Sequence, residues 1–206
     1  MLELKLFKSL HPFTITQGFG RNDGFDYTKI CTSQGRCLLA HNGLDCIRGY
    51  TNGVYNETEG ANVRVAHNGI VSFSGVDSFG GYFVEVRTTE QYLDKTGVPH
   101  YWKTIYYHLR PNIRVRAGQR VQIGDILGYA DNTGLYTTGS HLHFGLKQVV
   151  QGGNEWTWIT LNEDNGYFGN VNPLPYLDVK TAYEWKIQLD QILGSIWNLI
   201  EVFRKS

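Results

Sequence analysis

The chain has 206 residues, and its acidic and basic side chains balance to a formal net charge of zero at pH 7. That balance argues against nucleic acid as a partner, because phosphate binding needs a basic footprint, and against electrostatic attraction to an anionic membrane. No apolar run is long enough to span a bilayer, and the length suits one sizeable domain with an appendage.

The N-terminal part combines a short strand with irregular chain. Residues 1–10 alternate apolar and polar side chains, as an exposed strand or arm does. They lack the uninterrupted apolar core of a secretory signal, so we expect no signal peptide. Residues 12–50 are expected to form an irregular entry into the domain.

Three cysteines, Cys31, Cys37 and Cys46, lie in this irregular segment. An odd number leaves at least one of them unpaired within the chain. Cys31 and Cys37 could close a small loop, Cys46 could pair near Asp45, or all three could be reduced thiols. Their spacing matches no cysteine-rich zinc site, so the sequence leaves the disulfide state open.

The middle of the chain is typical of short antiparallel strands joined by tight turns. Glycine is frequent, with 24 residues, and aromatic side chains make up 14% of the chain. The predicted elements are a hairpin of residues 62–74 and 81–88, an insertion at 89–101, a strand at 102–109, two short strands within 113–130 and a strand at 141–149. We therefore expect a mainly β, antiparallel single domain with an open groove across one sheet.

The C-terminal part changes from a strand pattern to a helix pattern. Residues 151–177 are aromatic and rich in glycine and asparagine, and they are expected to wrap back over the domain. Apolar residues then recur at alternating spacings of three and four, which predicts an amphipathic helix of about 26 residues. Its seam consists of Ala182, Trp185, Leu189, Ile192, Ile196, Leu199 and Phe203.

This helix depends on packing for its stability. Gly194 costs on the order of 1 kcal/mol relative to alanine, so the helix needs tertiary or quaternary contacts. It could dock against its own domain, or it could join copies of the chain or other subunits. We divide the chain into a domain of residues 1–177 and a helical segment of residues 178–206.

Histidines from separate parts of the sequence, together with one aspartate, are the candidate residues for metal binding and proton transfer. His41 and Asp45 flank an Asn-Gly turn, whereas His141 and His143 stand two apart in a β-prone segment and would both project into one groove. His108 lies between these pairs. Two imidazoles and one carboxylate can hold a zinc ion with an open fourth position, and further imidazoles could move protons. Each residue alone would be explained more simply as a turn or strand side chain.

The other histidines lack such a pattern. His67 also precedes Asn-Gly, but the residue four positions later is Val71, so we interpret His67 as structural. His11 and His100 have no partner pattern and are expected to be exposed.

The ordered motifs resemble the M23 family of zinc metallopeptidases, the lysostaphin-type peptidoglycan endopeptidases. That family carries H-x-x-x-D, a lone histidine in a Tyr-x-His-Leu context, and a later H-x-H. Here these motifs fall at residues 41–45, 106–109 and 141–143. Further similarities at residues 19–21, 63–71, 121–128 and 138–144 extend the resemblance over roughly residues 12–150. The resemblance implies an antiparallel, barrel-sandwich-like domain with an open groove, followed here by a C-terminal α-helix.

The resemblance also implies the roles of the site residues. His41, Asp45 and His143 would bind one zinc ion, and His108 and His141 would form the catalytic pair. Zinc activates water, and an imidazole with a pKa near ~6.5 can accept or return a proton. The sequence does not show which histidine is the general base. The implied partner is a peptide of bacterial peptidoglycan.

Several departures from the family pattern bear on the groove. Gly145 stands where the family often has an acidic residue. Residues 22–39 expand the first half-site and are expected to form a surface loop on the groove rim. The insertion at 89–101 is also expected to reshape the groove, so a cleavage preference cannot be transferred. The family's auxiliary tyrosine near the first half-site cannot be placed.

The leading hypothesis is a zinc endopeptidase that cuts cross-bridges or stems of the bacterial cell wall. The expected lack of a signal peptide, together with the helix, suggests an enzyme carried in a phage tail or released on lysis. The main alternative is a non-catalytic structural, tail or wall-binding module, although all five chemical groups persist. A carrier-type domain is disfavoured because no lysine lies between Lys103 and Lys147.

Overall fold

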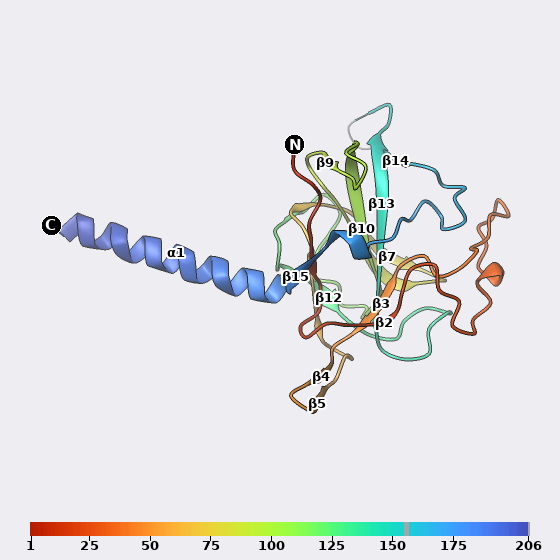
Figure 1. Ribbon diagram of the computed structural model, residues 1–206, viewed down its shortest axis with the longest axis horizontal. Coiled ribbons are helices and arrows are strands. Elements are labelled where there is room, and N and C mark those ends of the chain that lie inside the picture. The colour runs from red at the N-terminus through yellow and green to blue at the C-terminus, as the bar shows by residue number, and fades with distance from the viewer. Residues whose placement is uncertain (155–156, 206) are drawn as a thin grey trace.

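The computed structural model describes residues 1–154 and 157–205 of the chain. Within these ranges, short strands make up most of the fold and one long helix ends it (Figure 1). The strands are β1 (Leu6–Lys8), β2 (Thr14–Gln17), β3 (Leu44–Ile47), β4 (Gly49–Thr51), β5 (Val54–Asn56), β6 (Asn62–Arg64), β7 (Gly69–Asp77), β8 (Gly81–Arg87), β9 (Tyr92–Leu93), β10 (Pro99–Leu109), β11 (Arg120–Val121), β12 (Ile126–Tyr129), β13 (Leu142–Gln151), β14 (Trp158–Thr160) and β15 (Leu177–Thr181). The helix α1 is Ala182–Lys205, and short 3-10 helices lie at Tyr27–Lys29 and Leu174–Tyr176.

One antiparallel sheet organises the domain. Its strand order is β11-β7-β8-β10-β13-β3-β2, with β9 added to β10 and β14 added to β13. Every pairing within this sheet is antiparallel. Outside it, β12 pairs with β6, β4 pairs with β5, and β1 runs parallel to β15. The expected mainly β, antiparallel fold with a C-terminal helix is confirmed.

The predicted strands agree with the structure except at their ends. β7 and β8 form the expected hairpin, but residues 62–64 separate from it as β6 and pair with β12. They separate because the backbone of Val65 bonds to residues 124 and 125 instead of continuing into β7. The insertion at 89–101 forms β9 and the start of β10, and the two short strands within 113–130 are β11 and β12.

The hydrophobic core covers one face of the central strands β10 and β13. Alternate side chains of these strands point into it, and Trp102, Tyr106, Phe144 and Leu146 are each at most 1% exposed. The Tyr106 hydroxyl accepts the backbone N–H of Ala66, so the phenol keeps a partner inside the core. Burial raises the pKa of Tyr106 to about 12. The opposite face of the same strands is therefore left to form the floor of the groove.

The structural role predicted for His67 is confirmed. Its side chain is buried, its Nδ1–H donates to the carbonyl of Asn68, and its Nε2 lies 2.9 Å from the Thr104 hydroxyl. Burial lowers the pKa of His67 to about 4, so the ring is neutral at neutral pH. The residues that line the groove do not include His67.

A capping box formed by Thr181 and Glu184 begins the helix α1. The Thr181 hydroxyl accepts the N–H of Glu184, and the Glu184 carboxylate accepts the N–H of Thr181 at 2.7 Å. Residues 178–181, which we had assigned to the helical segment, pair with β1 as part of β15 instead. Trp185 packs on Phe7 with ring centroids 5.7 Å apart, so the first turn is anchored to the domain.

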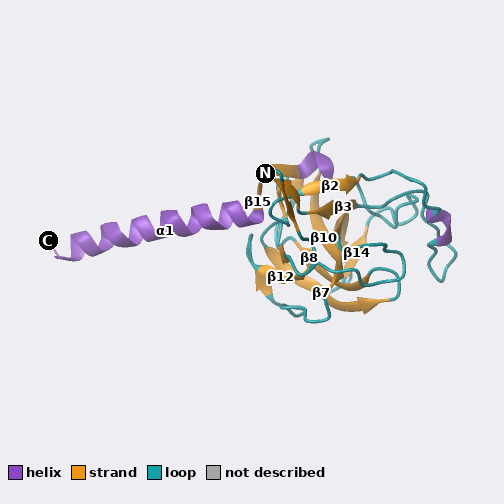
Figure 2. Ribbon diagram, turned by 90° about the horizontal axis from the view of Figure 1, so that it is seen from below, coloured by secondary structure: helices purple, strands orange, loops and turns teal. Residues whose placement is uncertain are grey.

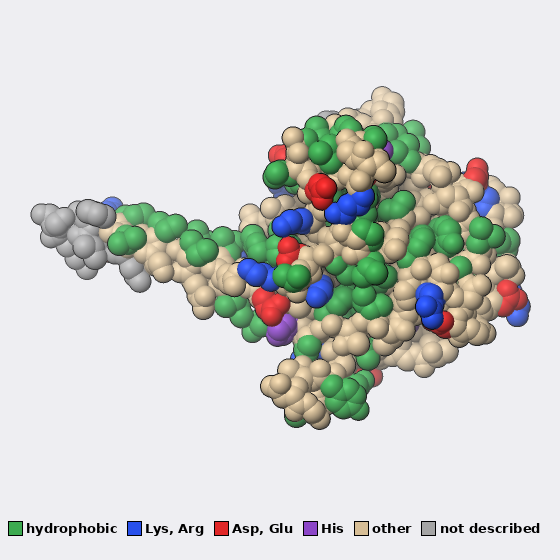
Figure 3. Space-filling model, in the orientation of Figure 1, with side chains coloured by type: hydrophobic (Ala, Val, Ile, Leu, Met, Phe, Trp, Pro, Cys, Tyr) green, Lys and Arg blue, Asp and Glu red, His purple; other side chains and the backbone are tan. Residues whose placement is uncertain are grey.

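Beyond this first turn, α1 points away from the domain (Figures 1 and 2). Its apolar side chains are therefore exposed, as the narrow projection in Figure 3 shows. Exposed fractions between 47% and 61% are found for Ile192, Leu193, Ile196, Trp197, Leu199 and Ile200.

The alternative that α1 docks on its own domain is thus wrong after its first turn, while a partner stays a prediction. The side chain of Phe203, which we placed in the seam, lies outside the described residues. In the part of the chain that the structure describes, no helix combines the length and the hydropathy needed to cross a bilayer.

Candidate metal centre and active site

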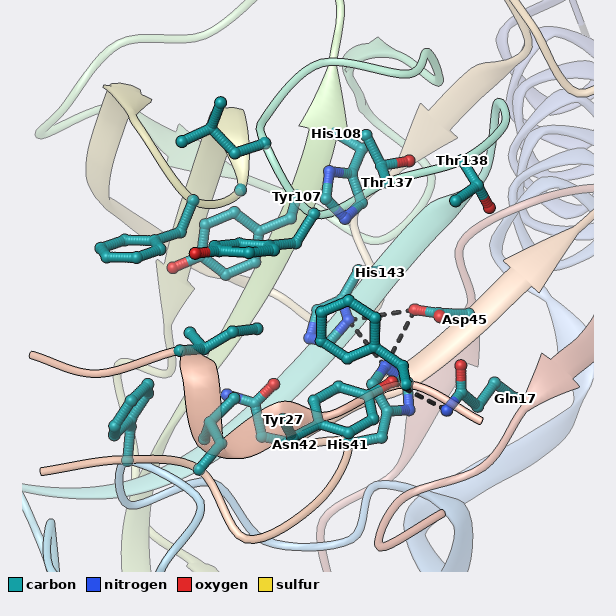
Figure 4. A pocket seen from close by; sticks show the side chains of 18 of the residues that line it. Gln17, Tyr27, His41, Asn42, Asp45, Tyr107, His108, Thr137, Thr138 and His143 are labelled. Carbon is teal, nitrogen blue, oxygen red and sulfur yellow. Dashed lines mark hydrogen bonds and ion pairs between the residues drawn. The ribbon is translucent and has the colours of Figure 1, made fainter. Parts of the chain in front are cut away.

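Three potential ligand atoms converge in the groove (Figure 4). His41 Nε2, Asp45 Oδ1 and His143 Nδ1 form a triangle, each edge of which is 3.0 Å long. A tetrahedral zinc ion with bonds of about 2.0–2.1 Å holds neighbouring ligand atoms roughly 3.3 Å apart, so a small expansion fits this triangle to zinc. The structure therefore brings together the three residues predicted as metal ligands.

The sheet register places this triangle. β3 and β13 are neighbours, and Asp45 pairs directly with His143 across them. His41 precedes β3, and its backbone is hydrogen bonded to residues 20–21. Gly43 passes close behind the His143 ring, because a Cβ at this position would lie 2.5 Å from its Nε2 and 2.8 Å from a backbone carbonyl. The Asn-Gly sequence between the two ligands is thus needed for the close approach as well as for the turn.

Hydrogen bonding fixes the tautomer of His41. Its Nδ1 lies 3.0 Å from the carbonyl of Gly18, which can only accept, so Nδ1 carries the proton. Its Nε2 then directs a lone pair at Asp45 Oδ1 and His143 Nδ1. Lone pairs that face one another at this distance repel unless a cation or a proton lies between them. The set of two imidazoles and one carboxylate therefore fits a zinc ion.

A bulge in β10 turns His108 into the groove. The register with β8 shifts between Tyr106 and Leu109, and the φ angle of His108 is 62°. Strict alternation would send Tyr107 to the groove and His108 to the core. Instead both residues line the groove, while Tyr106 and Leu109 are buried in the core. Positive φ angles outside glycine are uncommon and cluster at functional sites.

The loop of residues 131–141 orients the other two imidazoles. His108 Nδ1–H donates to the carbonyl of Thr133, and His141 Nδ1–H donates to the carbonyl of Gly139, both at 2.7 Å. In each ring this leaves Nε2 available for proton exchange. The ring centroids are 4.6 Å apart, so the two histidines predicted as the catalytic pair lie side by side.

Burial and charge set the pKa values of these groups. Burial lowers the pKa of His108 to about 3, and the neighbouring His141 and His143 add to this effect. Burial also lowers the pKa of His141, but the Asp45 carboxylate outweighs burial, and the pKa of His141 is raised. Burial would raise the pKa of Asp45, yet the surrounding imidazoles of His141, His143 and His41 hold this pKa well below its usual range. Burial thus keeps His108 neutral at neutral pH, whereas Asp45 shifts the pKa of the neighbouring His141 upward.

The groove is a cavity of about 620 Å³ between the sheet and two rims. Tyr107 and His143 belong to its floor. The loop of residues 22–39 forms one rim, as expected, and the loop of residues 131–141 forms the other. The insertion at 89–101 contributes none of the lining residues, so the expectation that it reshapes the groove is wrong.

Two of the three cysteines close a small loop within the rim formed by residues 22–39. Cys31 and Cys37 form a disulfide, which is the small-loop alternative. Cys46 is a buried free thiol whose pKa is raised by burial. The alternatives in which Cys46 pairs or all three thiols stay reduced are therefore wrong.

Tyr27 is a site residue that the sequence did not reveal. It begins a 3-10 helix within the rim loop, and its ring centroid lies 5.7 Å from that of His41. Its hydroxyl accepts a hydrogen bond of 2.8 Å from Gln17. Burial raises the pKa of Tyr27 to about 12, and the charge of Asp45 adds to this effect. Its place beside the first half-site suits the auxiliary tyrosine that the family resemblance implies.

The departure at Gly145 has a packing reason. A Cβ at this position would lie 3.2 Å from Asn170 Oδ1 and 3.4 Å from Ile105 Cβ, so glycine makes room for the buried Asn170 side chain. Asn170 belongs to residues 151–177, and it forms a β-bridge with Lys147 of β13. This contact agrees with the predicted wrapping of the segment over the domain.

The two remaining histidines lie outside the groove. His11 is exposed, as predicted. The side chain of His100 is only 16% exposed, and its Nε2 lies 3.2 Å from Asp94. The expected exposure of His100 is therefore wrong, because the insertion at 89–101 folds back on its own strand.

Known proteins share both the motifs and the fold of this chain. The profile of peptidase family M23 matches residues 49–157, a range that contains His108, His141 and His143. Peptidoglycan DD-endopeptidase ShyC of Vibrio cholerae serotype O1 is 30% identical over 107 residues, which are 52% of this chain. The match spans only 20% of that protein.

Two solved structures illustrate the likeness in fold. The structure of LytU has a TM-score of 0.50 at 24% identity, and the match covers 79% of this chain and 82% of that one. The antimicrobial peptidase lysostaphin from Staphylococcus simulans has a TM-score of 0.50 at 19% identity, with 84% and 54% of the two chains covered. The profile match extends over more than half of the sequence and includes three of the five converging groups. The chain belongs to peptidase family M23.

Proposed function

We propose that this chain is a zinc-dependent endopeptidase that hydrolyses peptide bonds in bacterial peptidoglycan. The observation that carries this proposal is the convergence of five groups in one cavity, namely His41, Asp45, His143, His108 and His141. The relative from Vibrio cholerae is named a peptidoglycan DD-endopeptidase, which supports the substrate class. The chain spans about a fifth of that relative, so the activity is inferred from the site first.

His41, Asp45 and His143 would hold the zinc ion as three protein ligands. When bound, zinc supplies a Lewis acid that polarises the scissile carbonyl and acidifies a water molecule. The Gly18 carbonyl keeps His41 in the tautomer that presents Nε2. Close packing of Gly43 keeps the His143 ring in place.

His108 and His141 would move protons during hydrolysis. Attack of water on the carbonyl carbon forms a C–O bond and needs an acceptor for one water proton. Cleavage of the C–N bond then needs a proton for the leaving amine. Both rings offer Nε2 for these transfers, because each Nδ1–H is bonded to a backbone carbonyl. One imidazole can carry the proton from water to amine, while the other stabilises the oxyanion.

A non-catalytic wall-binding or structural module is the rival function. Such a module needs the fold but no converging ligand atoms and no strained backbone at His108. A non-glycine residue with φ of 62° costs roughly 1–3 kcal/mol, and such strain persists where the surroundings enforce it. The bulge and the triangle together therefore favour an enzyme.

Release of new amino groups from purified peptidoglycan tests the proposal. We expect release by the zinc-loaded protein, loss of release on chelation, and loss in the variant His141→Ala. His100→Ala is the matched control, because His100 lies outside the cavity and its loss should leave release unchanged. If protein that binds zinc releases nothing from several wall types, the endopeptidase is ruled out and the module is favoured.

The C-terminal helix is proposed to join copies of the chain. Its exposed apolar residues follow a spacing of three and four, which suits a seam between like helices. Action at the cell wall follows from the proposed substrate. Carriage in a phage tail rests on the sequence alone and has no support from the fold or the relatives.

A further inference from the structure

A row of aromatic side chains crosses the cavity, and its central pair, Phe25 and Tyr136, has no part in the hydrolysis proposed above. Phe25, on the rim of residues 22–39, packs edge-on against Tyr136 of the opposite rim with ring centroids 5.9 Å apart. The ring centroids of Phe25 and Tyr27 are 4.8 Å apart, and Tyr136 stacks on Phe79 with ring centroids 5.9 Å apart. All four side chains line the cavity that contains the metal triangle. The two rims of the groove therefore touch within the cavity that contains the metal triangle.

The rim that carries Phe25 is held by contacts outside this row. Its disulfide closes the loop, and Arg36 pairs with Glu163 of the wrapping segment at 2.8 Å. The N–H of Leu39 donates to the carbonyl of Gly166 at 2.9 Å. These contacts fix the position from which Phe25 reaches across the groove.

The rim that carries Tyr136 is held equally closely. The N–H of Leu135 lies 3.2 Å from the carbonyls of both Ser78 and Phe79. A Cβ at Gly134 would lie 2.5 Å from the Phe79 carbonyl, so the loop and the β7–β8 turn are in direct backbone contact. The contact between Phe25 and Tyr136 is therefore preorganised on both sides.

We propose that Phe25 and Tyr136 form an aromatic bar that limits the width of the peptide at the scissile bond. This inference rests on the proposed hydrolysis, because it names what the same site selects. In this proposal, a peptide lies between the bar and the floor formed by Tyr107 and His143 when it reaches the metal triangle. A small side chain next to the scissile bond passes under the rings, whereas a bulky one forces them apart.

The strength of the contact between Phe25 and Tyr136 determines how strongly the bar prefers a small side chain over a bulky one. An edge-to-face aromatic pair changes the equilibrium between touching and separated rings about two- to twelvefold. Phe25 is 40% and Tyr136 37% exposed, so both rings have room to swing outward. The bar therefore discriminates between substrates and does not block the groove.

Two synthetic peptides that differ only in alanine or leucine beside the scissile bond test this selection. The wild-type chain should prefer the alanine peptide in kcat/KM. Phe25→Ala and Tyr136→Ala should each reduce this preference about two- to twelvefold by raising the rate on the leucine peptide. Phe73→Ala is the matched control, because Phe73 is 39% exposed, stacks on Phe83 and lies outside the cavity. An unchanged preference in both bar variants would overturn the proposal.

A binding measurement separates failure of the bar from failure of the hydrolysis. Acetohydroxamate and the bulkier benzohydroxamate are titrated into the cobalt-loaded protein and followed by its visible absorption. Phe25→Ala and Tyr136→Ala should each strengthen the binding of benzohydroxamate relative to that of acetohydroxamate about two- to twelvefold. If no peptide is cleaved but this ratio shifts, the hydrolysis is wrong and the bar stands. If peptides are cleaved and neither ratio shifts, the bar is wrong and the hydrolysis stands.

Discussion

Lowering the pH from 7.5 to 5 should destabilise the folded chain through His67, a buried imidazole outside the groove. In the unfolded chain its pKa is near ~6.5, whereas burial lowers it to about 4 in the fold. Between these two values the unfolded state binds more protons than the folded state. The free energy of unfolding therefore falls as the pH drops below about 6.5, and the loss is nearly complete at the folded pKa.

The size of this effect follows from the two pKa values. Their separation corresponds to a total of about 3 kcal/mol, of which about 2 kcal/mol is lost by pH 5. Solvent screening reduces this free energy only slightly, because His67 is only 5% exposed. Both ring nitrogens already have hydrogen-bond partners, namely the Asn68 carbonyl and the Thr104 hydroxyl.

Urea unfolding of the wild-type chain and of His67→Gln, each at pH 7.5 and pH 5 with a chelator present, measures this contribution. The chelator removes the pH dependence of metal binding from both proteins. Other groups that titrate in this range contribute equally to both and cancel in the difference. We expect the wild-type chain to lose about 2 kcal/mol more than the variant. Equal losses would refute the argument that His67 is held neutral by burial.

Three further changes probe the site and the helix. Gly43→Ala should weaken zinc binding about 10- to 100-fold in a competitive chelator titration, because the new Cβ displaces the His143 ring; unchanged affinity would show that the backbone yields instead. His108→Gly and His108→Val should both abolish hydrolysis, but the valine variant should be about 1–2 kcal/mol less stable in urea, since only glycine accepts the positive φ readily; equal stability would contradict the bulge. Replacing Ile192 and Ile196 together by aspartate should convert the assembled chain to monomers in light scattering, and a monomeric wild-type chain would contradict association through α1.

Short-range patterns in the sequence predicted most of the fold and the make-up of the site. The spacing of His141 and His143 indicates a strand with both rings on one face, and both rings do line the groove while Leu142 is buried. The 3-4 spacing from Ala182 onward predicts the helix, which the structure places at Ala182–Lys205. In each case the information lies within a few residues, where backbone geometry alone decides which side chains share a face.

The features that the sequence did not predict depend on contacts between distant residues. Nothing near Phe25 indicates that its ring meets Tyr136, because the contact requires two rims that are set by separate parts of the chain. The missed position of Tyr27 has the same cause, since the expanded rim loop obscures its relation to His41. The direction of α1 is also set by its anchoring turn, which the periodicity of the helix does not contain.

The bulge at His108 shows how one distant residue can create a site that strand alternation forbids. Directly after the bulge, Leu109 and Tyr82 are register partners again across β10 and β8. The Thr133 hydroxyl joins the backbones of this pair, since it donates to the Leu109 carbonyl at 2.7 Å and accepts the Tyr82 N–H at 3.1 Å. The Thr133 carbonyl meanwhile accepts Nδ1–H of His108. The same residue therefore stabilises the irregular strand and orients the imidazole that the irregularity exposes, so the position of His108 is encoded as much at Thr133 as in β10 itself.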